Sequence, residues 1–142
     1  MAVVIERRYS EAIHPLHAML LAGSVPLFLG ALLSDLAYFR TYEIQWANFA
    51  SWLLVGALIF SGLALIFAIV DLCQARQRAA GLIPYAVLVL VAWVVGVFNA
   101  LMHARDAWAV MPGGLIMSVI TTSLVLLAAW LGFCTPRMGG VK

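Results

Sequence analysis

The sequence predicts an all-α integral membrane protein in which four helices cross the bilayer as an up-down-up-down bundle. Hydrophobic residues make up 65% of the 142 residues, and charged residues only 10%. The mean hydropathy is +1.07, so a water-soluble domain of this size would lack the polar residues needed to cover its surface. Four apolar stretches are each long enough to cross a ~30 Å hydrocarbon layer, and short polar turns separate them.

The first span is predicted over residues 14–38, after a charged leader at 1–12. The stretch Ala18–Ser34 carries no charge. Pro26 removes one backbone donor from its middle, which membrane helices tolerate when neighbouring groups supply the missing bond. The apolar run is longer than that of a signal peptide, so we expect it to remain as an uncleaved span.

Two polar residues mark the ends of this first span. His17 and Asp35 are eighteen residues apart, which gives them the same angular position on a helix at a separation of about 27 Å along its axis. The helix therefore presents a polar group toward one side near each membrane face.

The other three spans are predicted over residues 46–71, 82–104 and 111–133. Pro84 and Pro112 lie in first-turn positions of the last two, where a missing amide costs little. The four spans form a single transmembrane domain over residues 13–135, followed by a short tail at 136–142.

The distribution of Lys and Arg predicts that both termini are cytoplasmic. Six of the eight basic residues lie in the leader, the loop between the second and third spans, or the tail: Arg7, Arg8, Arg76, Arg78, Arg137 and Lys142. The positive-inside rule places these segments in the cytoplasm. Cys73 and Cys134 fall on the same side, where thiols stay reduced, so no structural disulfide is expected.

This topology sorts the unusual polar residues into two groups at opposite ends of the bundle. The group at the cytoplasmic face consists of His14, His17, Asp71 and Cys73. The group at the outer face consists of Asp35, Asn99, His103, Arg105 and Asp106. Asn99, His103 and Asp106 share a helical face if the third helix persists that far. Groups at different ends cannot meet, which excludes a haem held jointly by His17 and His103 within one subunit.

The cytoplasmic group has two interpretations. His14 and His17 lie on one helical face, and Asp71 or Cys73 could complete a metal site, or the histidines could hold haem. Alternatively, both histidines are interfacial polar residues that cap a helix or bond to a neighbour. We favour the second, because H-x-x-H is a short pattern and a structural zinc site needs four ligands.

The outer group also has two interpretations. Ionisable residues in an apolar zone are costly, which makes a proton or ligand site a candidate. Alternatively, Asp35 accepts hydrogen bonds from Arg105 or His103 and locks two helices together. We favour the lock, because Asp35 and Asp106 lie close to helix ends, where we expect water to reach them.

Hydroxyl side chains crowd the middle of the fourth span. They are Ser118, Thr121, Thr122 and Ser123. We expect them to bond the carbonyls of their own helix, four residues earlier in the chain.

The chain resembles the bacterial membrane-protein family catalogued as domain of unknown function 2231. The resemblance runs from His14 to Phe133, and its most specific pieces are H-P-L-H and the later N-A-x-x-H-A-R-D-A-W. The residues that match its motif positions are His14, Pro15, His17, Asp35, Asn99, His103, Arg105 and Asp106. The resemblance implies a four-helix domain of the bacterial inner membrane, and relatives found beside redox domains hint at electron transfer. Many relatives carry a second histidine pattern where this chain reads GLIPYAVL, which removes an axial partner for haem.

The sequence argues against several classes of function and leaves three functional hypotheses. The sequence shows no nucleophile with an assignable base and no Gly-rich phosphate loop, so we assign no catalytic residue and do not expect an independent enzyme. It also shows no stripe of basic residues, so we do not expect nucleic-acid binding. The leading hypothesis is an accessory subunit for membrane electron transfer that binds haem b or quinone through His14 and His17. The alternatives are a small proton- or metal-coupled transporter and a non-catalytic scaffold. Rows of small residues would allow a homodimer or a membrane redox partner.

Overall fold

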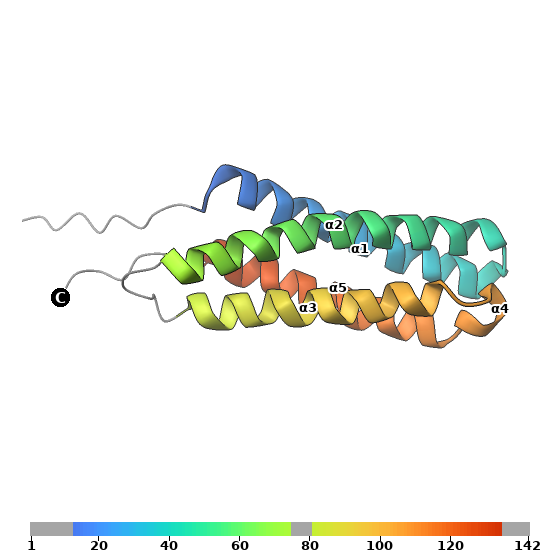
Figure 1. Cartoon of the computed structure of the whole chain (residues 1–142). Coiled ribbons are helices and arrows are strands. Elements are labelled where there is room, and N and C mark those ends of the chain that lie inside the picture. The colour runs from blue at the N-terminus through green and yellow to red at the C-terminus, as the bar shows by residue number, and fades with distance from the viewer. Residues whose placement is uncertain (1–12, 75–80, 135–142) are drawn as a thin grey trace, which may run out of the picture.

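The described part of the chain folds only into helices. The computed structural model describes residues 13–74 and 81–134. Its elements are α1 (Pro15–Thr41), α2 (Ile44–Gln74), α3 (Leu82–His103), the short α4 (Ala107–Val110) and α5 (Gly113–Cys134). The four long helices run alongside one another (Figure 1). All four are long and apolar enough to cross a membrane, which confirms the predicted all-α class with four spans.

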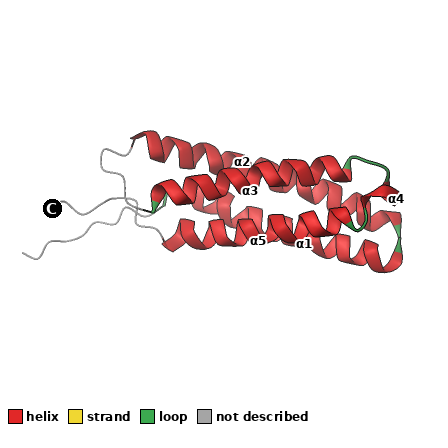
Figure 2. Cartoon of the chain, turned by 90° about the horizontal axis from the view of Figure 1, so that it is seen from below, coloured by secondary structure: helices red, strands yellow, loops and turns green. Residues whose placement is uncertain are grey.

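Consecutive long helices run in opposite directions, as an up-down-up-down bundle requires. Helix α1 packs against α2 and α5, and α3 packs against the same two helices. Helices α1 and α3 therefore occupy opposite corners and run in the same direction. We call the end where α1 begins and α5 finishes the N-terminal end, and the opposite end, where the short helix lies, the α4 end (Figure 2).

Local signals define both ends of α1. His14 Nδ1 accepts the backbone N–H of Leu16 at 3.3 Å, and Pro15 occupies the first turn, where its missing amide leaves no unmade bond. At the other end, Tyr42 adopts a left-handed conformation with φ of 55°. Its N–H donates to the carbonyl of Tyr38 at 2.7 Å, which satisfies one of the last carbonyls of the helix.

The core consists of two clusters of buried apolar side chains. The cluster toward the N-terminal end includes Leu20, Leu21, Leu65, Leu82, Tyr85 and Val89. The cluster in the middle of the bundle consists of Phe28, Ala31, Leu54, Ala57, Ala92 and Val125. Alanines in these clusters let helices approach closely, which matters in lipid because packing drives association there.

The outer surface of the bundle is apolar. Large side chains such as Met19, Trp52 and Trp130 are about 70% exposed. Contiguous apolar surface on this scale is unfavourable in water and is matched by lipid tails. The bundle therefore belongs in a bilayer.

A short segment closes the α4 end. The Asp106 side chain accepts the N–H of Trp108 at 3.4 Å and so caps α4. Tyr38 donates to the carbonyl of Ala107 at 3.1 Å, and the rings of Tyr42 and Trp108 stack with centroids 6.2 Å apart. These contacts attach α4 to the last turns of α1.

Candidate functional site

A buried hydrogen-bond network joins three helices near the α4 end. Asp35 on α1 is fully buried, and its Oδ1 lies 2.7 Å from Nε2 of His103 on α3. Ser118 on α5 donates to Asp35 Oδ2 at 2.5 Å and accepts from Asn99 Nδ2 at 2.9 Å. We call Asp35, Asn99, His103 and Ser118 the Asp35 cluster. It connects the diagonal pair α1 and α3 through the centre of the bundle.

The side chain of His103 has a defined protonation pattern. Its Nδ1 lies 2.9 Å from the backbone carbonyl of Asn99, and a carbonyl can only accept. Nδ1 therefore carries a hydrogen. The bond between Nε2 and Asp35 must then contain one further proton, because two bare acceptors would repel at 2.7 Å. The pair is either imidazolium with carboxylate or neutral imidazole with carboxylic acid, and both forms have zero net charge. That neutrality suits an apolar site, where an unpaired charge is costly.

A glycine lets α5 approach this site. A Cβ on Gly114 would lie 3.1 Å from His103 Cε1 and would collide with Val110. The absence of a side chain at Gly114 therefore leaves room for the imidazole between α3 and α5.

One acceptor in the cluster has no partner among the described residues. The Oδ1 atom of Asn99 is buried and receives no hydrogen bond there. A buried acceptor without a partner costs about 1–3 kcal/mol.

A second polar network lies at the N-terminal end. His17 on α1 is fully buried, with Nε2 at 2.8 Å from the Tyr85 hydroxyl on α3 and Nδ1 at 3.4 Å from Asp71 Oδ2 on α2. Its ring stacks on Phe67 with centroids 5.5 Å apart. We call His17, Phe67, Asp71 and Tyr85 the His17 cluster. The side chain of Asp71 is 30% exposed, so this network reaches the surface of the bundle.

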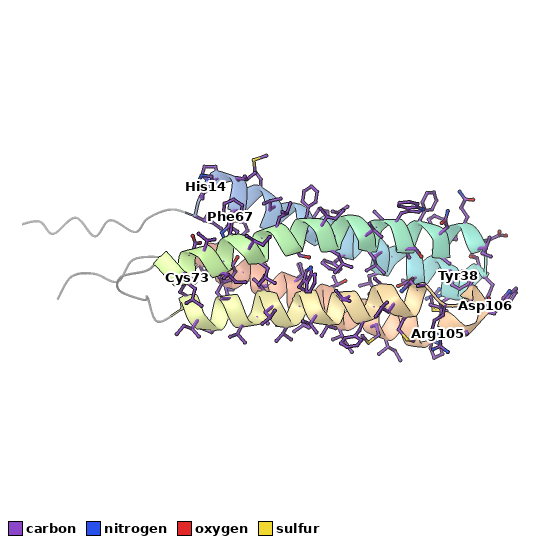
Figure 3. The ribbon with its side chains drawn as sticks, in the orientation of Figure 1. His14, Tyr38, Phe67, Cys73, Arg105 and Asp106 are labelled. Carbon is purple, nitrogen blue, oxygen red and sulfur yellow. The ribbon has the colours of Figure 1, made fainter. Side chains whose placement is uncertain are left out.

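The remaining members of the predicted cytoplasmic group lie at the rim. His14 is exposed, caps α1 and stacks on Phe67 with centroids 5.7 Å apart, and Cys73 is exposed at the same end of the bundle (Figure 3). The structure gives no support to haem or quinone binding here, because both ring nitrogens of His17 already face protein groups. Among the described residues, no three His, Cys, Asp or Glu side chains are grouped to hold a metal ion.

Two members of the predicted outer group lie outside the Asp35 cluster. Helix α3 ends at His103, so the face expected to include Asp106 stops before it, and Asp106 caps α4 instead. Arg105 is exposed, and its Nη1 lies 4.0 Å from the sulfur of Met102. The partner of Asp35 is therefore His103 and not Arg105. Full burial also contradicts the expectation that water reaches Asp35, because α3 and α5 cover the carboxylate.

The hydroxyl groups of α5 divide between two roles. Thr121 and Ser123 bond the carbonyls of Met117 and Val119, as expected for their own helix. Ser118 and Thr122 differ, because they donate across the bundle to Asp35 and to the carbonyl of Phe28 on α1.

Sequence reasoning missed Tyr85 and Ser118 as partners. One signal for Tyr85 was available in the chain. Tyr85 and His103 are eighteen residues apart, as are His17 and Asp35, so two parallel helices in register bring both pairs together. For Ser118 the sequence offers no comparable signal, because its hydroxyl could equally bond its own helix.

A comparison with known families agrees with this architecture. The sequence model of a family described as predicted membrane protein (DUF2231) matches residues 13–137. This range contains all the described helices and both polar clusters. Searches of curated proteins and of solved structures found no match.

Proposed function

The chain belongs to the DUF2231 family of predicted membrane proteins, and we propose that it is a proton-binding membrane protein whose proton lies between Asp35 and His103. The observation that supports this proposal is the contact of His103 Nδ1 with the carbonyl of Asn99. This contact requires Nδ1 to carry a hydrogen. The bond between Nε2 and Asp35 therefore depends on one further, exchangeable proton.

Loss of that proton changes the contacts between helices. It leaves an Asp35 carboxylate facing the lone pair of Nε2, and the pair changes from neutral to a charge of minus one. The bond that links the diagonal helices α1 and α3 is then replaced by repulsion. When one arrangement of the helices binds the proton and another does not, binding of the proton shifts the equilibrium toward the first arrangement. The proposed activity is therefore proton uptake and release coupled to helix packing, as in a small proton-coupled transporter.

The same geometry favours a proton over the other ligands considered. Metal coordination would need further ligands, and haem would need a ring nitrogen that does not already face a protein group. The uncharged neighbours of the pair, Ser118 and Asn99, orient the carboxylate without supplying charge. A proton is the ligand that this arrangement already requires.

Infrared spectroscopy can test the proposal in lipid nanodiscs. We expect the carboxyl band of Asp35 and the ring bands of His103 to change reversibly when the pH is varied from about 5 to about 10. Asp35→Asn should abolish the change, and Asp106→Asn, which alters an exposed carboxylate at the same end, should leave it intact. Bands that stay constant over this range while the bundle remains folded would show that the pair is a permanent structural lock, as in a scaffold.

We also propose that the protein lies in the bacterial inner membrane with the N-terminal end of its bundle facing the cytoplasm. The support for this is the count of basic residues in the leader, the second loop and the tail. Cys73 and Cys134 are both exposed and serve as reporters of that end. A membrane-impermeant maleimide should label them in opened membranes and not in intact cells. Labelling of intact cells would reverse the proposed orientation without affecting the proton site.

A further inference from the structure

A groove opens on the lipid-facing side of α3 and α5, near the α4 end. Its volume is about 580 Å³, within the range of ~300–1,000 Å³ typical of ligand sites. Its lining consists of Phe98, Leu101, Met102, Arg105, Gly113, Ile116 and Met117. Phe98, Leu101 and Ile116 are each more than half exposed, so the groove is open to the hydrocarbon of the membrane.

The lining of the groove includes a glycine, Gly113. A Cβ on Gly113 would lie 2.9 Å from the terminal carbon of Met102, the flexible end of another side chain of the lining. The surface of the groove is entirely apolar, and Arg105 is the one charged residue beside it in the part of the chain that the structure describes, with its Nη1 4.0 Å from the sulfur of Met102.

Arg105 lies at the α4 end of the bundle, beyond the last residue of α3 (Figure 3). Among the described residues, no carboxylate forms an ion pair with it. A guanidinium binds phosphate oxygens through two parallel hydrogen bonds. Basic side chains beside clefts between membrane helices bind lipid headgroups in the same way.

We propose that this groove binds one phospholipid of net negative charge, with an acyl chain against the apolar lining and the phosphate on Arg105. Charge complementarity identifies the occupant. A second apolar helix could cover Phe98 and Ile116, but it would leave the guanidinium without a counter-charge. A phospholipid supplies both the hydrocarbon and the anion. This inference is independent of the proton site.

Native mass spectrometry of the full chain released from detergent micelles can test the proposal. With phosphatidylglycerol added at increasing concentration, we expect one lipid to be retained at saturation, and phosphatidylcholine with the same acyl chains to be retained more weakly. Arg105→Gln should weaken phosphatidylglycerol retention about tenfold, since it removes a charged hydrogen-bonding group. Arg40→Gln is the matched control, because Arg40 is also exposed in the last turn of α1 at the same end and should leave retention unchanged.

A second pair of variants tests the groove itself. Ile116→Trp adds bulk to the lining and should lower retention, whereas Ile120→Trp, one turn further along α5 and outside the groove, should not. Equal retention of both lipids, or equal losses from Arg105→Gln and Arg40→Gln, would overturn the proposal. Dimers that persist at the expense of bound lipid would assign the groove to a second copy of the chain and would overturn it as well.

Discussion

The two ends of the bundle share the same arrangement of polar contacts but differ in how deeply their carboxylates are buried. At each end a residue of α1 meets a residue of α3 across the bundle: His17 with Tyr85, and Asp35 with His103. Eighteen residues, or five helical turns, separate the two layers on both helices. The His17 cluster reaches the surface through Asp71, whereas the carboxylate of the Asp35 cluster is fully buried.

Helix α5 repeats the same spacing of eighteen residues. Gly114 faces His103, and Gly132, eighteen residues later, faces Tyr85. A Cβ on Gly132 would lie 2.7 Å from Tyr85 Cε2. Each polar layer therefore combines a diagonal hydrogen bond with a glycine that makes room for the ring of α3.

The chemical difference lies in the partner on α3. The Tyr85 hydroxyl can donate to Nε2 of a neutral His17 or accept from a charged one, so either protonation state of His17 keeps the bond. The bond between His103 and Asp35 has no such freedom, because Nδ1 of His103 is committed to a carbonyl. The comparison teaches that similar geometry can give one tolerant polar layer and one that depends on a single proton.

The largest expected effect comes from removing the buried carboxylate. Asp35→Ala leaves His103 buried without its partner, and we expect the free energy of unfolding to fall by about 3–5 kcal/mol. Asp71→Ala, at the partly exposed carboxylate of the other end, should cost much less. Unfolding in mixed detergent micelles measures both. Equal losses from the two variants would remove the distinction between the ends.

Adding a methyl group to either glycine should have an intermediate effect. Gly114→Ala and Gly132→Ala each force a neighbour to move, and overpacking of this kind costs about 1–3 kcal/mol. The same unfolding measurement applies, together with the infrared bands of His103, which Gly114→Ala should shift and Gly132→Ala should not. A shift from Gly132→Ala alone would contradict the assigned contacts.

The smallest expected effect comes from the tolerant layer. His17→Phe keeps an aromatic ring against Phe67 and removes the bond to Tyr85, so we expect a loss of about 1 kcal/mol. The infrared response proposed for Asp35 should be unaffected, because the apolar core in the middle of the bundle separates the two clusters. A change in that response would show that the two ends are coupled.

The sequence predicted the four helices because lipid imposes a strong and simple requirement, long uncharged spans with polar turns between them. It also placed His17 and Asp35 at opposite ends from helical periodicity alone. It did not choose His103 over Arg105 as the partner of Asp35, because that choice depends on α3 ending at His103. Nor did it find Ser118, because a serine hydroxyl can bond its own helix as readily as a neighbour.

The apolar middle of the bundle also decides where an electrical potential would fall. Phe28, Leu54 and Val125 pack there as buried side chains, and such a region contains no mobile charge. The field is therefore steepest across these residues. In the function proposed above, a proton that reaches Asp35 from the α4 end does not cross these residues, so its binding would involve little of the ~2.3 kcal/mol per 100 mV of a full crossing. The proposed exchange of this proton should therefore depend little on voltage.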